Sequence, residues 1–142
     1  MRQYTFSFKK ENYVDKEMFE KGLKIRREVL GADYVDNAIA SADDFNRPLQ
    51  ELVTQYCWGE IWGRPGLDRK TRSMLVIAIT TALGRWEELR LHVRATRNTG
   101  VSRDEVKEVL LQAAVYAGVP AANTAFHHAA AVYREMDEEA GS

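Results

Sequence analysis

The sequence predicts an all-α domain of six to seven helices. Apolar residues recur at helical spacing along most of the chain, and no segment keeps the alternation of apolar and polar residues that is typical of a strand. The chain has 142 residues and no glycine- or serine-rich linker, so a single domain is expected. We assign that domain to residues 15–138, after an N-terminal arm at 1–14 and before a tail at 139–142.

The first half of the chain is expected to contain three helices. Asp15 is a suitable N-cap for the first, which ends at Gly31. A short second helix is expected over residues 34–41. Pro48 suits the first turn of a third helix, whose apolar residues keep helical spacing until about Trp62, where a GRPG turn follows.

The fourth expected helix begins after Asp68 and contains the sequence MLVIAITTAL, which is apolar on every side. Such a helix is expected to be buried at the centre of something larger than two packed layers. Gly84 ends it, and a fifth helix follows as far as Asn98, with Gly100 as its C-terminal stop.

Two further helices complete the predicted fold. Ser102 and Glu105 form an S-x-x-E capping box for the first of them, which ends at Gly118. Pro120 opens the last helix, which runs to about residue 137. Alanine recurs in this helix, so a neighbouring helix can approach it closely.

Composition excludes several classes of function. The chain has 20 basic and 21 acidic side chains, so its net charge of −1 supplies no field that would attract nucleic acid or an anionic membrane. No run approaches the roughly 18 apolar residues of a membrane span, and the N-terminus lacks the apolar core of a signal peptide, so we expect a cytoplasmic protein. Cys57 is the only cysteine, which excludes an intrachain disulfide and a two-cysteine redox centre.

Residues 83–100, LGRWEELRLHVRATRNTG, contain the pair on which the functional prediction rests. Glu88 and His92 are four residues apart, so a helix places both side chains on one face. A carboxylate beside an imidazole can transfer protons near neutral pH. Arginines at positions 85, 90, 94 and 97 lie in the same segment, after an apolar helix, and predict an anion site at the edge of a dry core.

Three motifs occur in the order and spacing typical of one family: RREVLGADYVDNA, WGEIWGRPGLDRKTRSML and EELRLHVRATRNTGVSRDEVKEVLLQAAVYAGVPAA. The chain therefore resembles the carboxymuconolactone decarboxylase family from about Met18 to Met136. The resemblance implies the alkylhydroperoxidase-like helical fold and a homo-oligomer, usually a hexamer. It implies decarboxylation of 4-carboxymuconolactone to the β-ketoadipate enol-lactone, in the protocatechuate branch of aromatic catabolism. No cofactor or metal is expected, because the conjugated lactone itself accepts the electron pair of the departing carboxylate.

The peroxide-reducing cousins of this family carry a CxxC motif followed by a histidine on the equivalent helix. His92 keeps the position of that histidine, whereas Arg85 and Glu88 stand where the cysteines would be, so thiol chemistry is not expected. The pair His127 and His128 is a second departure, because arginine or an apolar residue is common there in the family.

The resemblance and the residue types together assign the roles in the site. His92 is expected to donate the proton that replaces CO2, and Glu88 to orient the imidazole and favour its protonated form. Arginine binds a carboxylate through two parallel hydrogen bonds, so one or two arginines are expected to hold the carboxylate that the substrate retains. The candidates are Arg64, Arg72, Arg85 and Arg94, with Arg90 the poorest because it lies on the opposite face of the helix.

Aromatic residues before the GRPG turn are candidates for the wall of the pocket. The expected wall for a flat ring consists of Trp58, Trp62 and Tyr56, with Glu60 near the mouth. Burial in the core or in a subunit interface is the alternative for these aromatics. His127 is a candidate anion contact, whereas it cannot chelate a metal with His128, which points about 100° away on a helix.

Two other functions stay open at this point. The protein could act on another lactone or unsaturated acid, because one fold supports several activities. It could also be a non-catalytic oligomeric binding or stress protein that keeps the helical fold without turnover.

Overall fold

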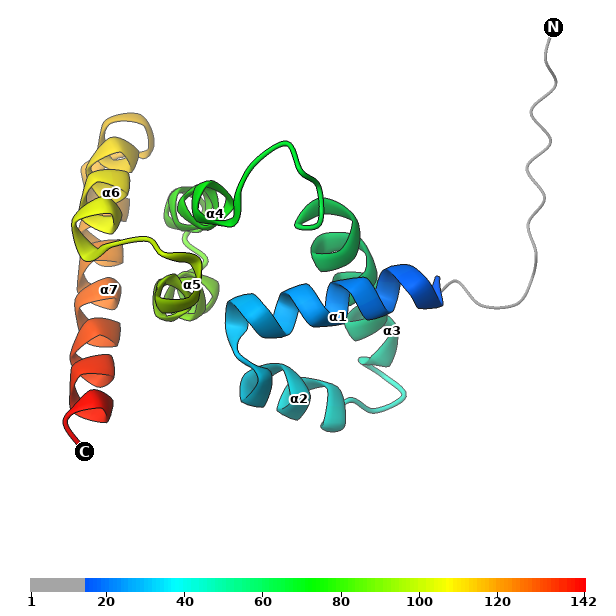
Figure 1. Cartoon of the computed structure of the whole chain (residues 1–142). Coiled ribbons are helices and arrows are strands. Elements are labelled where there is room, and N and C mark those ends of the chain that lie inside the picture. Colours follow the sequence, from blue (N-terminus) through cyan, green and yellow to red (C-terminus); the bar gives the residue numbers. More distant parts are fainter. Residues whose placement is uncertain (1–14) are drawn as a thin grey trace, which may run out of the picture.

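The structure, a computed structural model, describes residues 15–142 and confirms the all-α prediction. Within this range the chain forms seven α-helices and one π-helix, and no strand (Figure 1). The elements are α1 (Lys16–Leu30), α2 (Ala32–Ala40), α3 (Arg47–Leu52), the π-helix η1 (Val53–Ile61), α4 (Arg69–Leu83), α5 (Trp86–Thr99), α6 (Arg103–Ala117) and α7 (Val119–Ala140). The predicted N-terminal arm, residues 1–14, lies outside the described residues.

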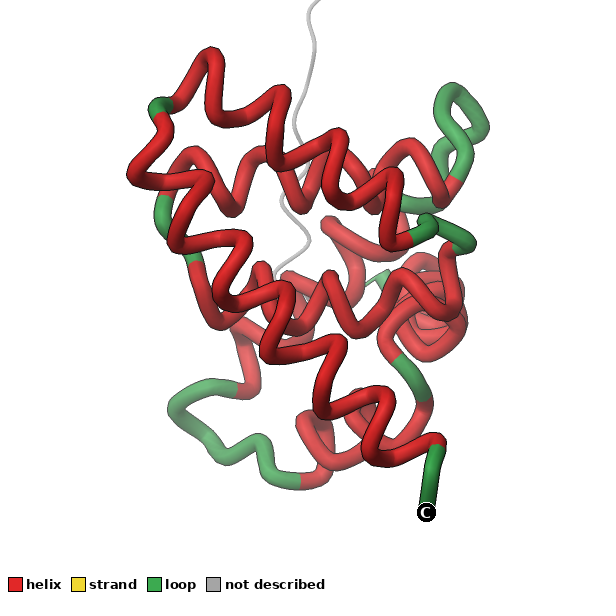
Figure 2. Tube along the Cα trace, turned by 90° about the vertical axis from the view of Figure 1, so that its left-hand side faces the viewer, coloured by secondary structure: helices red, strands yellow, loops and turns green. Residues whose placement is uncertain are grey.

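The helices form three layers (Figure 1). One outer layer consists of α6 and α7, the middle layer of α4 and α5, and the other outer layer of α1, α2, α3 and η1. Figure 2 shows the same helices from the perpendicular direction, joined by loops. Because α5 packs against α7 on one side and against α1 on the other, it belongs to both halves of the protein.

Two apolar clusters hold the layers together. The first lies among the last four helices and includes Ile77, Leu89, Val93, Leu110 and Val132. The second lies among α1, α2, η1 and α5 and includes Ile25, Val29, Val35, Trp58 and Ala95. Residues three or four apart share a helix face, so α5 presents one face to each cluster.

The predicted helix starts are confirmed where the sequence supplies a cap. The Asp68 carboxylate accepts a hydrogen bond from the Thr71 N–H at 2.7 Å, and Asp15 caps α1 in the same way. Ser102 and Glu105 form the capping box, in which each side chain accepts a hydrogen bond from the other residue's N–H, at 3.0 and 3.1 Å. These contacts satisfy N–H groups that the first turn of a helix leaves unpaired.

The single helix expected from Pro48 to Trp62 is wrong in its geometry, since α3 continues into the π-helix η1. In a π-helix the N–H bonds to the carbonyl five residues earlier, as the Trp62 N–H does to Cys57 at 2.9 Å. Over a segment of 9 residues, apolar spacing does not distinguish this pattern from an α-helix.

Two glycines let η1 lie directly against α1. A Cβ added at Gly22 would overlap the Thr54 carbonyl oxygen and would lie 2.8 Å from the Gly59 nitrogen. A Cβ added at Gly59 would lie 2.5 Å from the Met18 carbonyl oxygen. The two backbones are therefore in contact, and neither glycine has room for a side chain.

Two helix boundaries also differ from the prediction. Helix α2 begins at Ala32, before the expected start, because the chain turns sharply at Gly31, whose φ is 93°. Helix α7 continues to Ala140, so it extends into the segment assigned to a tail.

Helix α4 is less buried than its apolar sequence predicts. Ile77 and Thr81 are fully buried, whereas Leu75, Ile79 and Leu83 are 45%, 54% and 65% exposed. The expectation of burial on every side is wrong for the single chain, because only one face of α4 meets α5, α6 and α7. The three exposed residues, spaced four apart, form a continuous apolar strip that we call the α4 stripe.

Replacing Gly22 with alanine should lower the free energy of unfolding by about 1–3 kcal/mol, because the added Cβ overlaps backbone atoms of η1. Urea or thermal unfolding measures the change. Gly66→Ala is the control, since a Cβ there meets no atom within 4 Å. Equal stability of the two variants would contradict the backbone contact between α1 and η1.

Candidate functional site

His92 lies on the face of α5 that meets η1. Its side chain is only 8% exposed, and its Nδ1 atom is buried and makes no hydrogen bond to residues 15–142. An unpaired buried polar atom costs about 1–3 kcal/mol. His92 Nδ1 is therefore a candidate contact for a ligand.

Two tryptophans of η1 stack against His92. The ring centroids of Trp58 and Trp62 are 4.7 Å apart, and the imidazole centroid lies 6.1 Å from Trp58 and 6.2 Å from Trp62. The Trp58 and His92 planes differ by only 4°. The predicted pocket residue Trp62 is thus a direct neighbour of the predicted proton donor, and both indoles offer flat apolar surfaces.

Burial controls the protonation of His92. It lowers the pKa of the imidazole from 6.5 to about 4, and the negative charge of Glu88 opposes this shift only in part. The imidazole is therefore neutral at pH 7. Glu88 favours the protonated form of His92, as expected, but the loss of hydration on burial outweighs the attraction of this one carboxylate.

Glu88 acts on His92 through its charge. The carboxylate is on the exposed side of α5, one turn before His92. In the described part of the chain, no hydrogen bond links it to the buried Nδ1 of the imidazole. The predicted pair therefore shares a helix face, on which Glu88 is exposed to solvent and His92 is buried.

Arg94 does not serve as a free receptor for a carboxylate. It donates to Glu135 at 2.8 Å and to both carboxylate oxygens of Glu139 at 2.9 Å. Arg90 also donates to Glu135, at 2.7 Å. These arginines join α5 to α7, so their role in the structure is to pair the two helices.

Arg72 and Arg64 lie side by side. The Nη2 of Arg72 donates to the Arg64 carbonyl oxygen at 3.2 Å, while its Nε is buried and makes no hydrogen bond to residues 15–142. Arg85 is exposed at the N-terminus of α5. Of the predicted arginines, Arg72 is thus the one with an unused buried donor.

Arg26 is a buried arginine that the motif analysis missed. Its side chain is 5% exposed, and its Nη1 donates to Gln50 at 2.9 Å and to Thr54 at 3.1 Å. A signal was present in the sequence, because Arg26 follows Gly22 by four residues and precedes Val29 by three, which places it on the buried face of α1.

Glu60 and His127 lie at the surface. Both are exposed, and among the described residues the ring contacts of His92 are with Trp58 and Trp62. The ring of His128 stacks on Trp86 with centroids 5.4 Å apart. The structure therefore does not bring Glu60 or His127 into contact with His92.

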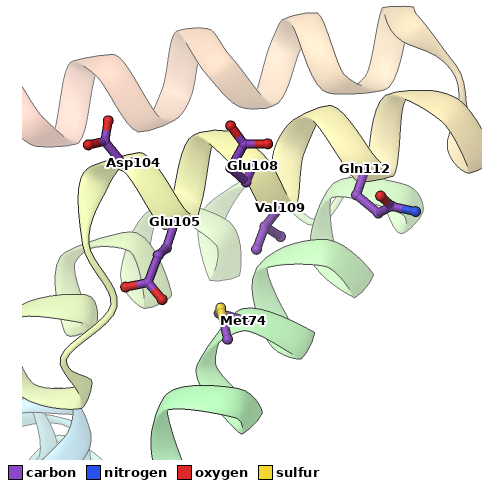
Figure 3. A pocket seen from close by; sticks show the side chains of 6 residues that line it. All are labelled: Met74, Asp104, Glu105, Glu108, Val109 and Gln112. Atoms are coloured by element: carbon purple, nitrogen blue, oxygen red, sulfur yellow. The ribbon is translucent and has the colours of Figure 1, made fainter.

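A cavity lies between α4 and α6 (Figure 3), and His92 is not among the residues that line it. Its volume is about 360 Å³, and it is lined by Met74, Asp104, Glu105, Glu108, Val109 and Gln112. Figure 3 shows that all of these except Met74 project from one helix, α6. Glu105 and Asp104 are paired with Lys70 and Lys107, whereas the lining itself contains acidic residues and no basic one. The cavity therefore offers no basic side chain that would bind the carboxylates of the predicted substrate.

Two kinds of feature are not found within residues 15–142. No three His, Cys, Asp or Glu side chains gather into a group that could hold a metal ion. None of the helices there combines the length and the apolar character that crossing a membrane requires.

Comparison with known proteins relates the chain to named decarboxylases. The sequence model of the Carboxymuconolactone decarboxylase family matches residues 47–131. The chain is 45% identical over 122 residues to 4-carboxymuconolactone decarboxylase of Acinetobacter baylyi, which covers 86% of this chain and 91% of the relative. It is 48% identical over 103 residues to nitrosuccinic acid decarboxylase of Metarhizium robertsii, which covers 72% of each chain. It is also 35% identical over 46 residues, 32% of this chain and 96% of the relative, to 4-carboxymuconolactone decarboxylase of Pseudomonas putida.

Lowering the pH from 7 to 5 should reduce the free energy of unfolding by about 2 kcal/mol through His92 alone. The folded-state pKa is about 4, so between pH 6.5 and that value the unfolded chain takes up a proton that the folded protein excludes. Urea unfolding at both pH values, in the wild type and in His92→Phe, measures the difference. The phenylalanine variant should lose this part of the pH dependence, whereas the exposed-site control His127→Phe should keep it. An unchanged pH dependence in His92→Phe would contradict the buried neutral imidazole.

Proposed function

Because this chain belongs to the carboxymuconolactone decarboxylase family, we propose that it is a carboxy-lyase that converts 4-carboxymuconolactone to the β-ketoadipate enol-lactone and CO2. The likeness to the Acinetobacter baylyi decarboxylase, over 86% of this chain, is the observation that carries the proposal. The family match at residues 47–131 includes Trp58, Trp62, Glu88 and His92.

The proposed reaction breaks the bond between the departing carboxylate and the ring carbon that carries the lactone oxygen. The electron pair of this bond passes through the ring double bond to the lactone carbonyl oxygen, which yields CO2 and a dienolate. A proton then adds to the ring carbon next to the carbonyl, and the dienolate electrons form the new carbon–hydrogen bond. The substrate supplies its own electron sink, so the protein has to hold the ring, stabilise the dienolate and deliver one proton.

His92 is the proposed proton donor, and substrate binding is the step that protonates it. In the protein alone, burial keeps the imidazole neutral at pH 7, with a pKa of about 4. A substrate with two carboxylates brings negative charge next to the ring, and this raises the pKa of the imidazole. Glu88 acts in the same direction. The proton is thus taken up together with the substrate and is then close to the carbon that needs it.

The indoles of Trp58 and Trp62 are the proposed wall against which the lactone ring lies. Their stacked rings lie beside His92. A carboxylate held against an apolar wall loses hydration, whereas neutral CO2 has little hydration to lose. The wall therefore favours departure of the carboxylate over its retention.

Arg72 is the proposed donor to the lactone carbonyl oxygen, where negative charge develops. Its Nε is buried and makes no hydrogen bond to the described residues, and its Nη2 is held by the Arg64 carbonyl oxygen. A donor that is positioned before the reaction stabilises the dienolate without reorganisation. Arg85, Glu60 and His127 lie at exposed positions, where we assign them at most a role at the entrance.

Decarboxylation of a nitro-substituted dicarboxylic acid is the second candidate function. It is favoured by the identity of 48% to a protein named nitrosuccinic acid decarboxylase. Nitrosuccinate and 4-carboxymuconolactone are both dicarboxylic acids in which one carboxylate lies next to a built-in electron sink. The same residues would serve either substrate, so assays with the two compounds distinguish the activities.

We further propose that the chain forms a homo-oligomer, usually a hexamer in this family, through the α4 stripe. Leu75, Ile79 and Leu83 expose large apolar surfaces, and α6, which packs against α4, also exposes the apolar residues Leu111 and Val115. A continuous apolar surface of this kind is typical of subunit contacts.

His92→Asn should lower kcat for 4-carboxymuconolactone by about 10²–10⁴-fold, because the amide cannot supply the proton. Glu88→Gln should have a smaller effect in the same direction, since only its charge acts on the imidazole. Loss of the lactone's ultraviolet absorbance, with CO2 release as a second measure, follows turnover. Glu87→Gln is the matched control, because this exposed carboxylate lies next to Glu88 in the sequence. Wild-type turnover in His92→Asn would refute the mechanism, and absence of turnover in the wild type would refute the substrate.

Ile79→Lys should dissociate the oligomer, because it places a charge at the centre of the α4 stripe. Sedimentation velocity of the wild type and the variant measures the change in mass. Asn37→Lys, at an exposed polar position of α2, is the control and should sediment as the wild type does. A wild-type protein that sediments as a monomer would contradict the proposed assembly.

A further inference from the structure

Arg26 carries a guanidinium in the interior of the protein, and no acidic side chain of residues 15–142 pairs with it. Its side chain is 5% exposed, and every hydrogen bond that it makes to the described residues runs from Nη1, to Gln50 and to Thr54. Both acceptors are uncharged. Its Nε is buried and makes no hydrogen bond to residues 15–142.

The electrostatic surroundings of Arg26 agree with this geometry. Burial lowers the pKa of its guanidinium, and the groups that oppose this shift are Tyr34 and Cys57, neither of which is a carboxylic acid. Taking an unpaired charge out of water is expensive. A protein that keeps such a charge in its core therefore bears a cost in stability, for which the contacts to Gln50 and Thr54 are weak compensation.

The unused part of the guanidinium has a defined shape. Nη1 is held by two acceptors, which leaves Nε and Nη2 along the opposite edge. In arginine these two atoms carry parallel N–H bonds, and this edge is one of the two that bind a carboxylate through both oxygens. Gln50 and Thr54 thus orient the guanidinium, while its carboxylate-binding edge makes no hydrogen bond to the described residues.

We propose that the Nε–Nη2 edge of Arg26 binds the carboxylate that the substrate retains after CO2 has left. This assignment rests on the proposed function. It implies that Arg26, on α1, determines the specificity for a dicarboxylic acid. It moves the predicted receptor away from the arginines of α5, where Arg94 is already paired with acidic residues of α7.

The position of Arg26 relative to the indole wall supports the proposal. Thr54, which accepts from Arg26, and Trp58, which stacks on His92, are both buried on η1 and lie four residues apart. The guanidinium and the imidazole therefore lie near successive turns of one helix. In the proposed complex, the ring of the ligand lies on Trp58 and its charged arm extends toward Arg26.

Gln50 offers a route for entry. Besides accepting from Arg26, it lines a cavity of about 150 Å³ between α1, α2 and α3, together with Phe19, Ile39, Ala42, Arg47 and Glu51. Rotation of the Gln50 side chain would open the guanidinium to this space, where the charges of Arg47 and Glu51 oppose each other.

The role of Arg26 predicts which kinetic parameter it controls. The retained carboxylate keeps its charge throughout the reaction, so its contact with Arg26 is as strong in the bound substrate as in the transition state. Removing such a contact raises KM and leaves kcat largely unchanged. An arginine on the departing carboxylate would stabilise the reactant instead, and its removal would raise kcat.

The test measures binding without turnover. The probes are 2-furylacetate, a flat ring with a carboxymethyl arm, and its uncharged methyl ester, followed by calorimetry and by the fluorescence of the tryptophans. Wild-type protein should bind the acid more tightly than the ester, and Arg26→Met should weaken binding of the acid by about 10- to 100-fold without changing that of the ester. Arg26→Lys should recover only part of the loss, because it keeps the charge without the two parallel donors.

Arg27→Met is the matched control. Arg27 is the next residue on α1, but it is exposed and paired with Asp36 at 2.6 Å, so its removal should leave the preference for the acid intact. The thermal stability of Arg26→Met provides a second measurement. If Arg26 serves binding, Arg26→Met should be as stable to heat as the wild type, because the substitution removes an unpaired buried charge.

Three results would overturn the proposal. The first is equal affinity of wild type and Arg26→Met for 2-furylacetate. The second is a large fall in thermal stability of Arg26→Met with an unchanged preference for the acid, which would make Arg26 a structural residue. The third is dissociation of the oligomer in Arg26→Met with unchanged binding, which would mean that a carboxylate of a second copy occupies the free edge. If the acid binds through Arg26 but the lactone is not turned over, the proposed substrate fails while the carboxylate site stands.

Discussion

The backbone contact between α1 and η1 is the constraint on which the rest of the structure depends. Gly22 and Gly59 remove the side chains that would separate the two helices. At this distance the buried residues of η1 fill the space between α1 and α5, and the two indoles reach His92. The π-helical hydrogen bonding of η1 belongs to the same arrangement, because it sets which residues of this segment face inward.

The interior built in this way combines a neutral imidazole with a charged guanidinium. Burial keeps His92 without a proton at pH 7 by lowering its pKa, whereas an arginine stays protonated even when burial lowers its pKa. Each residue has a buried nitrogen that makes no hydrogen bond within residues 15–142. In the proposed complex, a ligand with two negative charges would satisfy both residues, since one carboxylate pairs with the guanidinium and the added charge favours the imidazolium. A local site of this kind is compatible with a net charge of −1 for the whole chain.

Much of the fold followed from local signals. The capping residues and glycine stops predicted most of the helices, because a helix end is decided by hydrogen bonds within a few residues. The errors occurred where distant segments decide. Apolar spacing does not reveal the hydrogen-bonding pattern of η1, because this pattern depends on contact with α1. It also does not reveal that the α4 stripe is exposed, because this depends on how many helices of the same chain pack against α4. For the site, spacing placed Glu88 and His92 on one face, but it could not show that Arg94 is occupied by Glu135 and Glu139 on another helix.

The helical class, most of the helix ends and the family could be read from the sequence alone, because each of these depends on residues that are close together in the chain or on motifs of fixed spacing. The spacing of Glu88 and His92 likewise predicted that the two residues share a helix face. Only the tertiary structure decided the protonation of His92, the two indoles stacked on it and the unpaired edge of Arg26. All three depend on how closely distant segments of the chain pack together and on how much water this packing excludes. Hydration and pairing are settled by residues that lie tens of positions apart in the chain, as Arg26 and Thr54 or Trp58 and His92 do.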